Sequence, residues 1–239
     1  MNFLGTVHAV LWQNFVFMSL LKISDNISYL PATENPLSAD VVFIQNDDAL
    51  WIFDCGRSDE AFLEILKFQD FVKKNNLTVN LVISHFHEDH TDNLIRVTPD
   101  FIYAGDFTAR HFGWNSVQEN SLKTGNNQAK IEIVSEAKSF QNGSVQLIPL
   151  VNSHSKGSLC LRFQNFLFLG DAVYPTEKKG RECYNVQQLN QEIQTLKNED
   201  CEHFCISHAK YFVKTKESVI KHLEEIYAKK IGNDPWIFL

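Results

Sequence analysis

The sequence predicts an α+β sandwich in which two β-sheets are faced by helices. Three observations lead to this prediction. The 239-residue chain is 44% apolar and 21% charged, so it can bury a large core. Strand-like segments come first, then a helix, then more strands, and helices close the chain. No repeat, low-complexity stretch or Pro/Gly/Ser-rich linker divides the sequence, so we expect one principal domain.

The first half of the chain begins with short apolar segments that we expect to be strands, at 27–30, 41–45 and 49–54. Ser58 then has the character of a helix N-cap, and two acidic residues follow where the helix dipole favours them. Apolar residues at helical spacing extend this helix to about residue 74. The next segment, 77–84, is largely apolar, which predicts a strand at the centre of a sheet.

The second half of the chain opens with a loop at 85–90 that leads into a short helix near 93–97. The polar segment 119–129 predicts another loop and is a candidate wall of a substrate pocket, as is 174–184. Helices are expected at 186–197 and 216–229, because each carries its apolar side chains on one face. Strands are expected at 101–104, 131–134, 145–150, 158–163, 166–169 and 202–207.

The amino terminus differs from the rest of the chain. Residues 1–21 contain no Asp, Glu, Lys or Arg, but polar side chains interrupt the apolar run. The segment lacks the positive start and small-residue cleavage site of a signal peptide, and it is too interrupted for a membrane span. We therefore expect residues 1–17 to be a non-core N-terminal extension and residues 18–239 to form a single domain, with no membrane partner.

The net charge of −7 disfavours nucleic acid as a partner, because phosphate contacts need clustered Lys and Arg. The five cysteines are an odd and sparse set without a CxxC pair. This pattern is typical of free thiols in a reducing compartment, so we expect a cytoplasmic protein. The sequence does not determine the oligomeric state.

The chemistry is concentrated directly after the apolar strand at 77–84. His85, His87, Asp89 and His90 place three imidazoles and a carboxylate within six residues. These groups are suitable ligands for zinc or iron. On one tight loop they can divide between two ions, His85 and His87 on one side, Asp89 and His90 on the other. The sequence therefore predicts a dinuclear metal site.

Two ions need more donors, and the chain offers them at the ends of three predicted strands. His154 follows the strand at 145–150, Asp171 follows the strand at 166–169, and His208 follows the strand at 202–207. Ligands are placed best by rigid strands that converge at one edge of a sheet. The remaining histidines lack a ligand-like context; they are His8, His111, His203 and His222.

With these residues in view, the chain resembles the metallo-β-lactamase-fold hydrolase superfamily over about residues 22–212. The similarity rests on the following segments: IFDCG at 52–56, SHFHEDH at 84–90, NSH at 152–154, FLFLGDAVY at 166–174 and CISH at 205–208. The resemblance implies a four-layer αβ/βα sandwich with the metal site at one edge. The sequence departs from the usual family pattern at Ser153 and Ser207, where Gly is frequent, and at Asp92-Asn93, where small residues often stand.

The resemblance also implies the ligand set. His85, His87 and His154 match the first metal site, and Asp89, His90 and His208 match the second. Asp171 matches the carboxylate that bridges both. Asp54 matches the first acidic motif, which usually supports the ligands from behind. No Cys stands at a ligand position, unlike in the lactamases that use a thiolate.

The expected activity is that of a dinuclear metal-dependent hydrolase, in which a metal-bridging hydroxide attacks a small ester, lactone or thioester. The expected cofactors are two divalent ions, Zn²⁺ first, with Fe or Mn as alternatives. Asp89 is expected to fix the nucleophile and pass a proton to the leaving group. Tyr174 occupies the position where the lactone hydrolases of this superfamily have a tyrosine that holds the substrate carbonyl.

The sequence leaves two alternative functions open. One is an iron-dependent redox enzyme on the same fold, although the oxygen reductases usually have Glu where this chain has His87. The other is a phosphodiesterase or nuclease, which the negative charge disfavours. A non-catalytic sensor or transport-linked role is disfavoured because every ligand position is intact.

Overall fold

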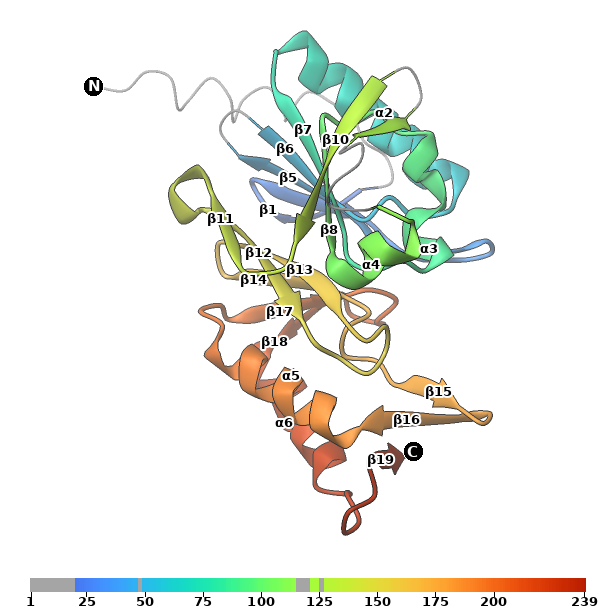
Figure 1. Ribbon diagram of the computed structural model, residues 1–239. Coiled ribbons are helices and arrows are strands. Elements are labelled where there is room, and N and C mark those ends of the chain that lie inside the picture. Colours follow the sequence, from blue (N-terminus) through green and yellow to red (C-terminus); the bar gives the residue numbers. More distant parts are fainter. Residues whose placement is uncertain (1–19, 47–48, 115–120, 125–126) are drawn as a thin grey trace, which may run out of the picture.

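Two mixed β-sheets face each other in the computed structural model, which describes residues 20–46, 49–114, 121–124 and 127–239 (Figure 1). The first sheet has eight strands, in the order β1 (Leu21–Ser24), β2 (Ile27–Leu30), β5 (Val41–Asn46), β6 (Ala49–Phe53), β7 (Thr78–Ile83), β8 (Phe101–Gly105), β10 (Asn127–Val134) and β9 (Ser121–Thr124). The second has six, in the order β11 (Lys138–Phe140), β12 (Val145–Leu150), β13 (Ser158–Phe163), β14 (Phe166–Gly170), β17 (His203–Ile206) and β18 (Val213–Thr215).

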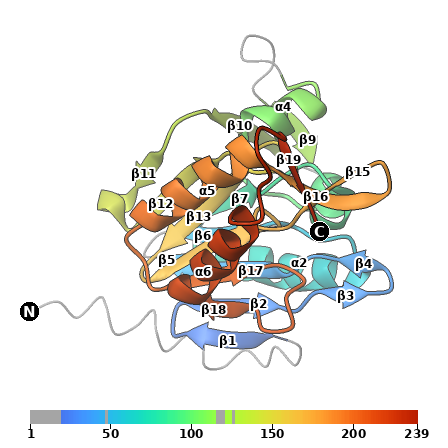
Figure 2. The ribbon, with the colours of Figure 1, turned by 90° about the horizontal axis from the view of Figure 1, so that it is seen from below.

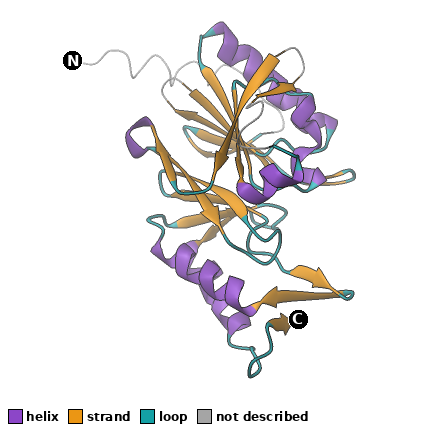
Figure 3. Cartoon of the chain, viewed as in Figure 1, coloured by secondary structure: helices purple, strands orange, loops and turns teal. Residues whose placement is uncertain are grey.

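Helices cover the outer faces of both sheets (Figure 3). The helices are α2 (Asp59–Lys74), α3 (Glu88–Thr91), α4 (Asp106–His111), α5 (Val186–Asn198) and α6 (Lys216–Tyr227), with short 3₁₀ turns at Asp92–Ile95 and Gln141–Gly143. Helix α2 packs on the first sheet, where the rings of Phe43 and Phe68 stack with centroids 4.2 Å apart. Helices α5 and α6 lie side by side on the second sheet (Figure 2).

The apolar side chains of the strands alternate between two cores, as the period of two in a strand requires. In β6, Leu50 and Ile52 face α2, whereas Trp51 and Phe53 lie between the two sheets. In β14, Phe168 lies between the sheets and its neighbours face α5 and α6. Four layers, α/β/β/α, therefore enclose three apolar cores, and the predicted αβ/βα sandwich is confirmed.

Two smaller sheets flank this sandwich. The hairpin of β3 (Thr33–Glu34) and β4 (Leu37–Ser38) precedes β5. The other small sheet joins β15 (Thr176–Lys178) and β16 (Arg181–Asn185) to the C-terminal β19 (Trp236–Phe238), and it extends away from the main sheets (Figure 1). The segment 174–184, proposed above as a pocket wall, forms most of this hairpin.

Two local predictions were wrong. The expected helix near 93–97 is instead α3 followed by the 3₁₀ turn. The polar segment expected as a loop at 119–129 contains β9 and the start of β10, a hairpin at the end of the first sheet. An edge hairpin is not enclosed on both sides, so it needs no long apolar run and is hard to recognise from composition.

The predicted N-terminal extension, residues 1–17, lies outside the described residues. Among the residues that are described, no helix combines the length and apolar character needed to cross a membrane.

Candidate metal centre

The ends of four strands converge at one edge of the sandwich. Strand β7 of the first sheet leads into His85, and β12, β14 and β17 of the second sheet run in the same direction and lead to His154, Asp171 and His208. The two sheets touch here, because Leu159 N donates to Ser84 O at 2.8 Å. The strand ends thus bring residues more than 100 positions apart into one site.

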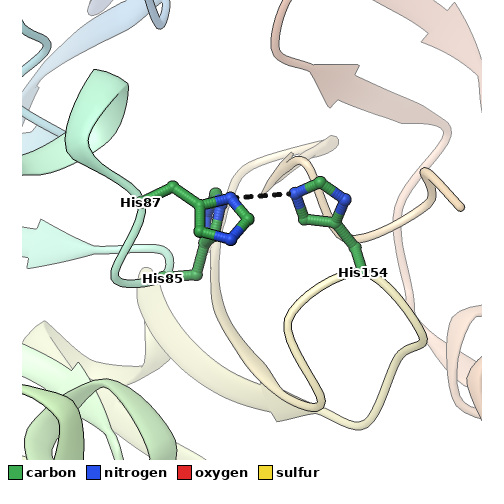
Figure 4. Close-up of side chains that lie close together, drawn as sticks. All are labelled: His85, His87 and His154. Carbon is green, nitrogen blue, oxygen red and sulfur yellow. Dashed lines mark hydrogen bonds between the residues drawn. The ribbon is translucent and has the colours of Figure 1, made fainter. Parts of the chain in front are cut away.

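The first cluster consists of three imidazoles (Figure 4). His87 Nδ1 lies 2.9 Å from His85 Nε2 and 3.2 Å from His154 Nε2. His87 and His154 face each other from different loops, and His85 lies beside His87. Three ring nitrogens that converge in this way can act as ligands of a single ion.

The second cluster combines two imidazoles with two carboxylates: Asp89, His90, Asp171 and His208. His208 Nε2 lies 3.0 Å from Asp89 Oδ2. His90 Nε2 lies 3.5 Å from Asp89 Oδ2 and 3.4 Å from Asp171 Oδ2. Each residue offers one donor atom to a common centre.

Asp171, a member of the second cluster, also lies close to the first cluster. Its Oδ2 is 3.6 Å from His154 Nε2 in the first cluster, and its Oδ1 is 4.0 Å from His208 Nε2 in the second. One carboxylate therefore reaches donors of both clusters, which is the placement that the resemblance implied for a bridging ligand.

Two buried atoms of this centre have no hydrogen-bond partner in the described part of the chain. They are His90 Nε2 and Asp171 Oδ1. Burying a polar atom without a partner costs free energy, so both atoms are suited to coordinate a cation. The donor set of imidazoles and carboxylates, without a thiolate, suits zinc or iron. The residues therefore fit two divalent ions.

The nitrogens that face away from the centre fix the ring tautomers. His154 Nδ1 donates to the Pro175 carbonyl at 3.1 Å, and a carbonyl oxygen can only accept. The proton of His154 is therefore on Nδ1, and the lone pair of Nε2 points into the centre.

Ser84 and Asp54 fix the tautomers of two further rings, those of His85 and His90. Ser84 Oγ donates to Asp54 Oδ2 at 2.8 Å, so it can accept from His85 Nδ1, which lies 3.0 Å away. Asp54 Oδ2 lies 2.7 Å from His90 Nδ1 and accepts a hydrogen bond from it. In its neutral form each ring then turns an unprotonated Nε2 toward the candidate ions.

Burial and charge shift the imidazole pKa values in opposite directions in the two clusters. Burial, reinforced by the neighbouring histidines, lowers the pKa of His85 and His87, so these rings are neutral at pH 7. Burial also acts to lower the pKa of His90 and His208. For His90 the carboxylates of Asp54 and Asp171 together outweigh burial, and for His208 the carboxylates of Asp89 and Asp171 together do so, which raises both pKa values. The second cluster thus favours positive charge.

The hydroxyl of Tyr174 points at the backbone. It donates to the Ser207 carbonyl at 2.8 Å, and burial raises the pKa of Tyr174 to about 12. A phenol has one hydrogen to donate. Contact with a substrate carbonyl would require this bond to break, so the catalytic role expected for Tyr174 stays a prediction.

Sequence reasoning missed three side chains behind the ligands: Ser84, Asp40 and Ser207. Ser84 and Ser207 each directly precede a predicted ligand, which is the one signal that pointed to them. Asp40 is distant in sequence from every ligand, yet it accepts from His208 N at 3.0 Å. The other described histidines lie outside both clusters, at His111, His203 and His222.

Comparison with known proteins gives a family and a fold. A family model described as the metallo-beta-lactamase superfamily matches residues 35–208. The solved structure of DIM-1 metallo-beta-lactamase is similar with a TM-score of 0.59 at 15% identity, covering 87% of this chain and 96% of that chain. Rm3 metallo-beta-lactamase is similar with a TM-score of 0.61 at 13% identity, covering 87% and 91%. No curated protein sequence matches the chain.

Proposed function

The chain belongs to the metallo-beta-lactamase superfamily and is a metal-dependent hydrolase, and from this premise we propose that it is a dinuclear zinc enzyme that hydrolyses a small ester, lactone or thioester. The observation that carries the proposal is that the carboxylate of Asp171, in the second cluster, also faces His154 of the first cluster. A carboxylate that faces donors on both sides is suited to bridge two ions.

In this proposal His85, His87 and His154 hold one ion, and Asp89, His90 and His208 hold the other, with Asp171 shared. When bound, two such ions lower the pKa of a coordinated water toward 7 and polarise a substrate carbonyl. The protein supplies the fixed positions of these groups, so little reorganisation is needed during the reaction.

Asp89 is the candidate for proton transfer. Burial acts to raise its pKa, but the hydrogen bond from His208 and the nearby His90 outweigh burial, so the pKa of Asp89 is lowered. The carboxylate is therefore ionised at neutral pH and able to hold the proton of the attacking water. A substrate can reach this carboxylate, whose side chain is 13% exposed, so Asp89 can then pass the proton to the leaving group.

The exposure of the ligands indicates the side from which a substrate enters. His90 is fully buried, whereas His154 and His208 are 17% and 20% exposed. A small substrate would therefore approach over His154 and His208 rather than past His90. The proposal includes a small-molecule substrate, no nucleic-acid partner and a cytoplasmic location, as expected from the sequence.

The test combines metal analysis with a substrate panel. Protein purified without added metal is analysed for zinc, iron and manganese, and assayed on lactone, thioester, simple ester, β-lactam and phosphodiester substrates. We expect about two zinc ions per chain and hydrolysis of at least one carbonyl substrate. H87A should lose metal and activity together, whereas H222A, an exposed histidine on α6, should retain both. Iron with oxygen-dependent turnover, or cleavage of the phosphodiester alone, would replace this proposal.

A further inference from the structure

His208 is held in an unusual backbone conformation. Its φ is +59°, in the left-handed region that residues with a side chain rarely adopt. Strand β17 ends at Ile206, so the strand ladder does not fix this residue. Some other contact must keep it in place.

Two side chains contact the peptide unit between Ser207 and His208. Asp40 Oδ2 accepts from His208 N at 3.0 Å and from Ser207 Oγ at 3.1 Å. On the other side, the Tyr174 hydroxyl donates to the Ser207 carbonyl at 2.8 Å. The carbonyl and the N–H of the same peptide unit are therefore both bonded to side chains.

The contact with Asp40 is reciprocal. Asp40 N donates to Ser207 Oγ at 3.0 Å while its carboxylate accepts from that hydroxyl. The preceding residue, Ala39, donates its N–H to the Asp89 carbonyl at 2.9 Å. The short segment before β5 thus holds the backbone of Asp89 as well as that of His208, the two residues whose side chains meet at 3.0 Å.

We propose that Asp40 and Tyr174 are positioning residues that set the affinity of the second metal site by holding the Ser207–His208 peptide unit. The inference rests on the proposed function, because it treats His208 as a ligand. Without the two contacts His208 relaxes toward negative φ, and its ring moves away from Asp89 and Asp171. Mutation of residues that orient a metal ligand typically lowers the metal affinity by about 10–100-fold.

This assignment gives Tyr174 a different role from the one that the resemblance implied. Its single hydroxyl hydrogen is used on Ser207, so the residue acts on the site through His208 rather than on the substrate. The two roles predict different results for Tyr174→Phe. A positioning residue changes zinc affinity, whereas a donor to the substrate changes turnover at saturating zinc.

The experiment titrates metal-free protein with Zn²⁺ in competition with a chromophoric chelator and resolves two dissociation constants. The variants are Y174F, D40A and D40N, with H208A as the reference for loss of the second site. The matched controls are Y184F, whose buried hydroxyl donates to the Val173 carbonyl at 2.9 Å, and D100A, whose carboxylate accepts from Val79 N at 2.8 Å. Thermal unfolding of each variant checks that it is folded.

We expect Y174F and D40A to lower the zinc affinity of the second site by about 10–100-fold and that of the first site by much less. D40N, which keeps an oxygen that can accept from His208 N, should retain more affinity than D40A. Y184F and D100A should bind both ions as the native protein does. If D40A is unfolded, Y174F and D40N carry the test.

Two results would overturn the inference in distinguishable ways. If the native protein binds two ions but Y174F and the folded Asp40 variants bind both with unchanged affinity, the positioning role is wrong and the proposed function stands. If the native protein does not bind two ions, or H208A binds them as well as the native protein does, the proposed function itself fails.

Discussion

The carboxylate of Asp54 lies 2.7 Å from His90 Nδ1, and both side chains are almost completely buried. The same carboxylate accepts from Ser84 N and from Ser84 Oγ, each at 2.8 Å. Asp54 itself has a φ of +59°, so the turn after β6 is shaped to bring this group behind the ligand loop. One buried acid thereby orients residues that face the candidate ions.

Replacing Asp54 by Asn should weaken zinc binding by about 10–100-fold, because a neutral amide accepts the His90 proton less strongly and cannot accept at both of its terminal atoms. The measurement is a competitive zinc titration of the metal-free protein. D100N is the control, since Asp100 accepts a backbone N–H away from the site. Unchanged zinc affinity in D54N would contradict the supporting role of Asp54.

Asp89→Ala should lower both zinc content and turnover. It removes a ligand of the second cluster and the proton-transfer group, so we expect turnover on the best substrate of the panel to fall by at least about 100-fold. The neighbouring E88A is the matched control, because the Glu88 side chain is 74% exposed and pairs with Arg57. Full turnover in D89A would defeat the assignment of Asp89.

Gly170→Ala should destabilise the fold and disturb the site. Gly170 has a φ of +56°, and a Cβ at this position would lie 2.7 Å from Ser84 Oγ. Overpacking and left-handed backbone together should cost about 2–4 kcal/mol in the free energy of unfolding, measured by urea denaturation. G180A is the control: Gly180 has a φ of +71° but open space around it, so about 1–2 kcal/mol is expected. Equal losses in the two variants would show that the contact with Ser84 is unimportant.

Glu192 should make stability depend on pH. It is fully buried on α5, neither carboxylate oxygen has a partner within the described residues, and burial raises the pKa of Glu192 well above 4.5. Above pH 4.5 the unfolded chain releases this proton while the folded chain keeps it. Its contribution to the free energy of unfolding is therefore full below pH 4.5 and is lost as pH rises toward the folded pKa.

Glu192→Met should remove this loss. We expect the free energy of unfolding at pH 7 to rise by about 1–3 kcal/mol, with a smaller gain at pH 5, measured by urea denaturation at both values. E225M, at an exposed position of α6, should show no such difference between the two pH values. A gain in E192M that does not depend on pH would mean that Glu192 is not protonated in the folded protein.

The sequence predicted most of the sandwich, because strands buried on both faces, such as β6 and β7, are nearly continuous apolar runs. Helix α2 was predicted from its N-cap residue and from the helical spacing of its apolar side chains. The sequence failed at the β9–β10 hairpin, which lies at the end of the sheet, and it did not identify β19. Strand β9 pairs with its neighbour β10 at the end of the sheet, where no long apolar run is needed. Strand β19 pairs with β16, which is distant in the sequence, and local composition does not encode a distant partner.

By itself, the sequence predicted which seven side chains form the metal site, because four of them stand together at 85–90 and the other three follow predicted strands. That they bind metal stays a prediction, but the structure brings all seven into two adjoining clusters. Only the tertiary structure decided how those rings are held. Asp40 lies 168 positions from His208, and Tyr174 acts on a backbone carbonyl 33 positions away, contacts that arise when separate strands end at the same edge and that no local pattern encodes.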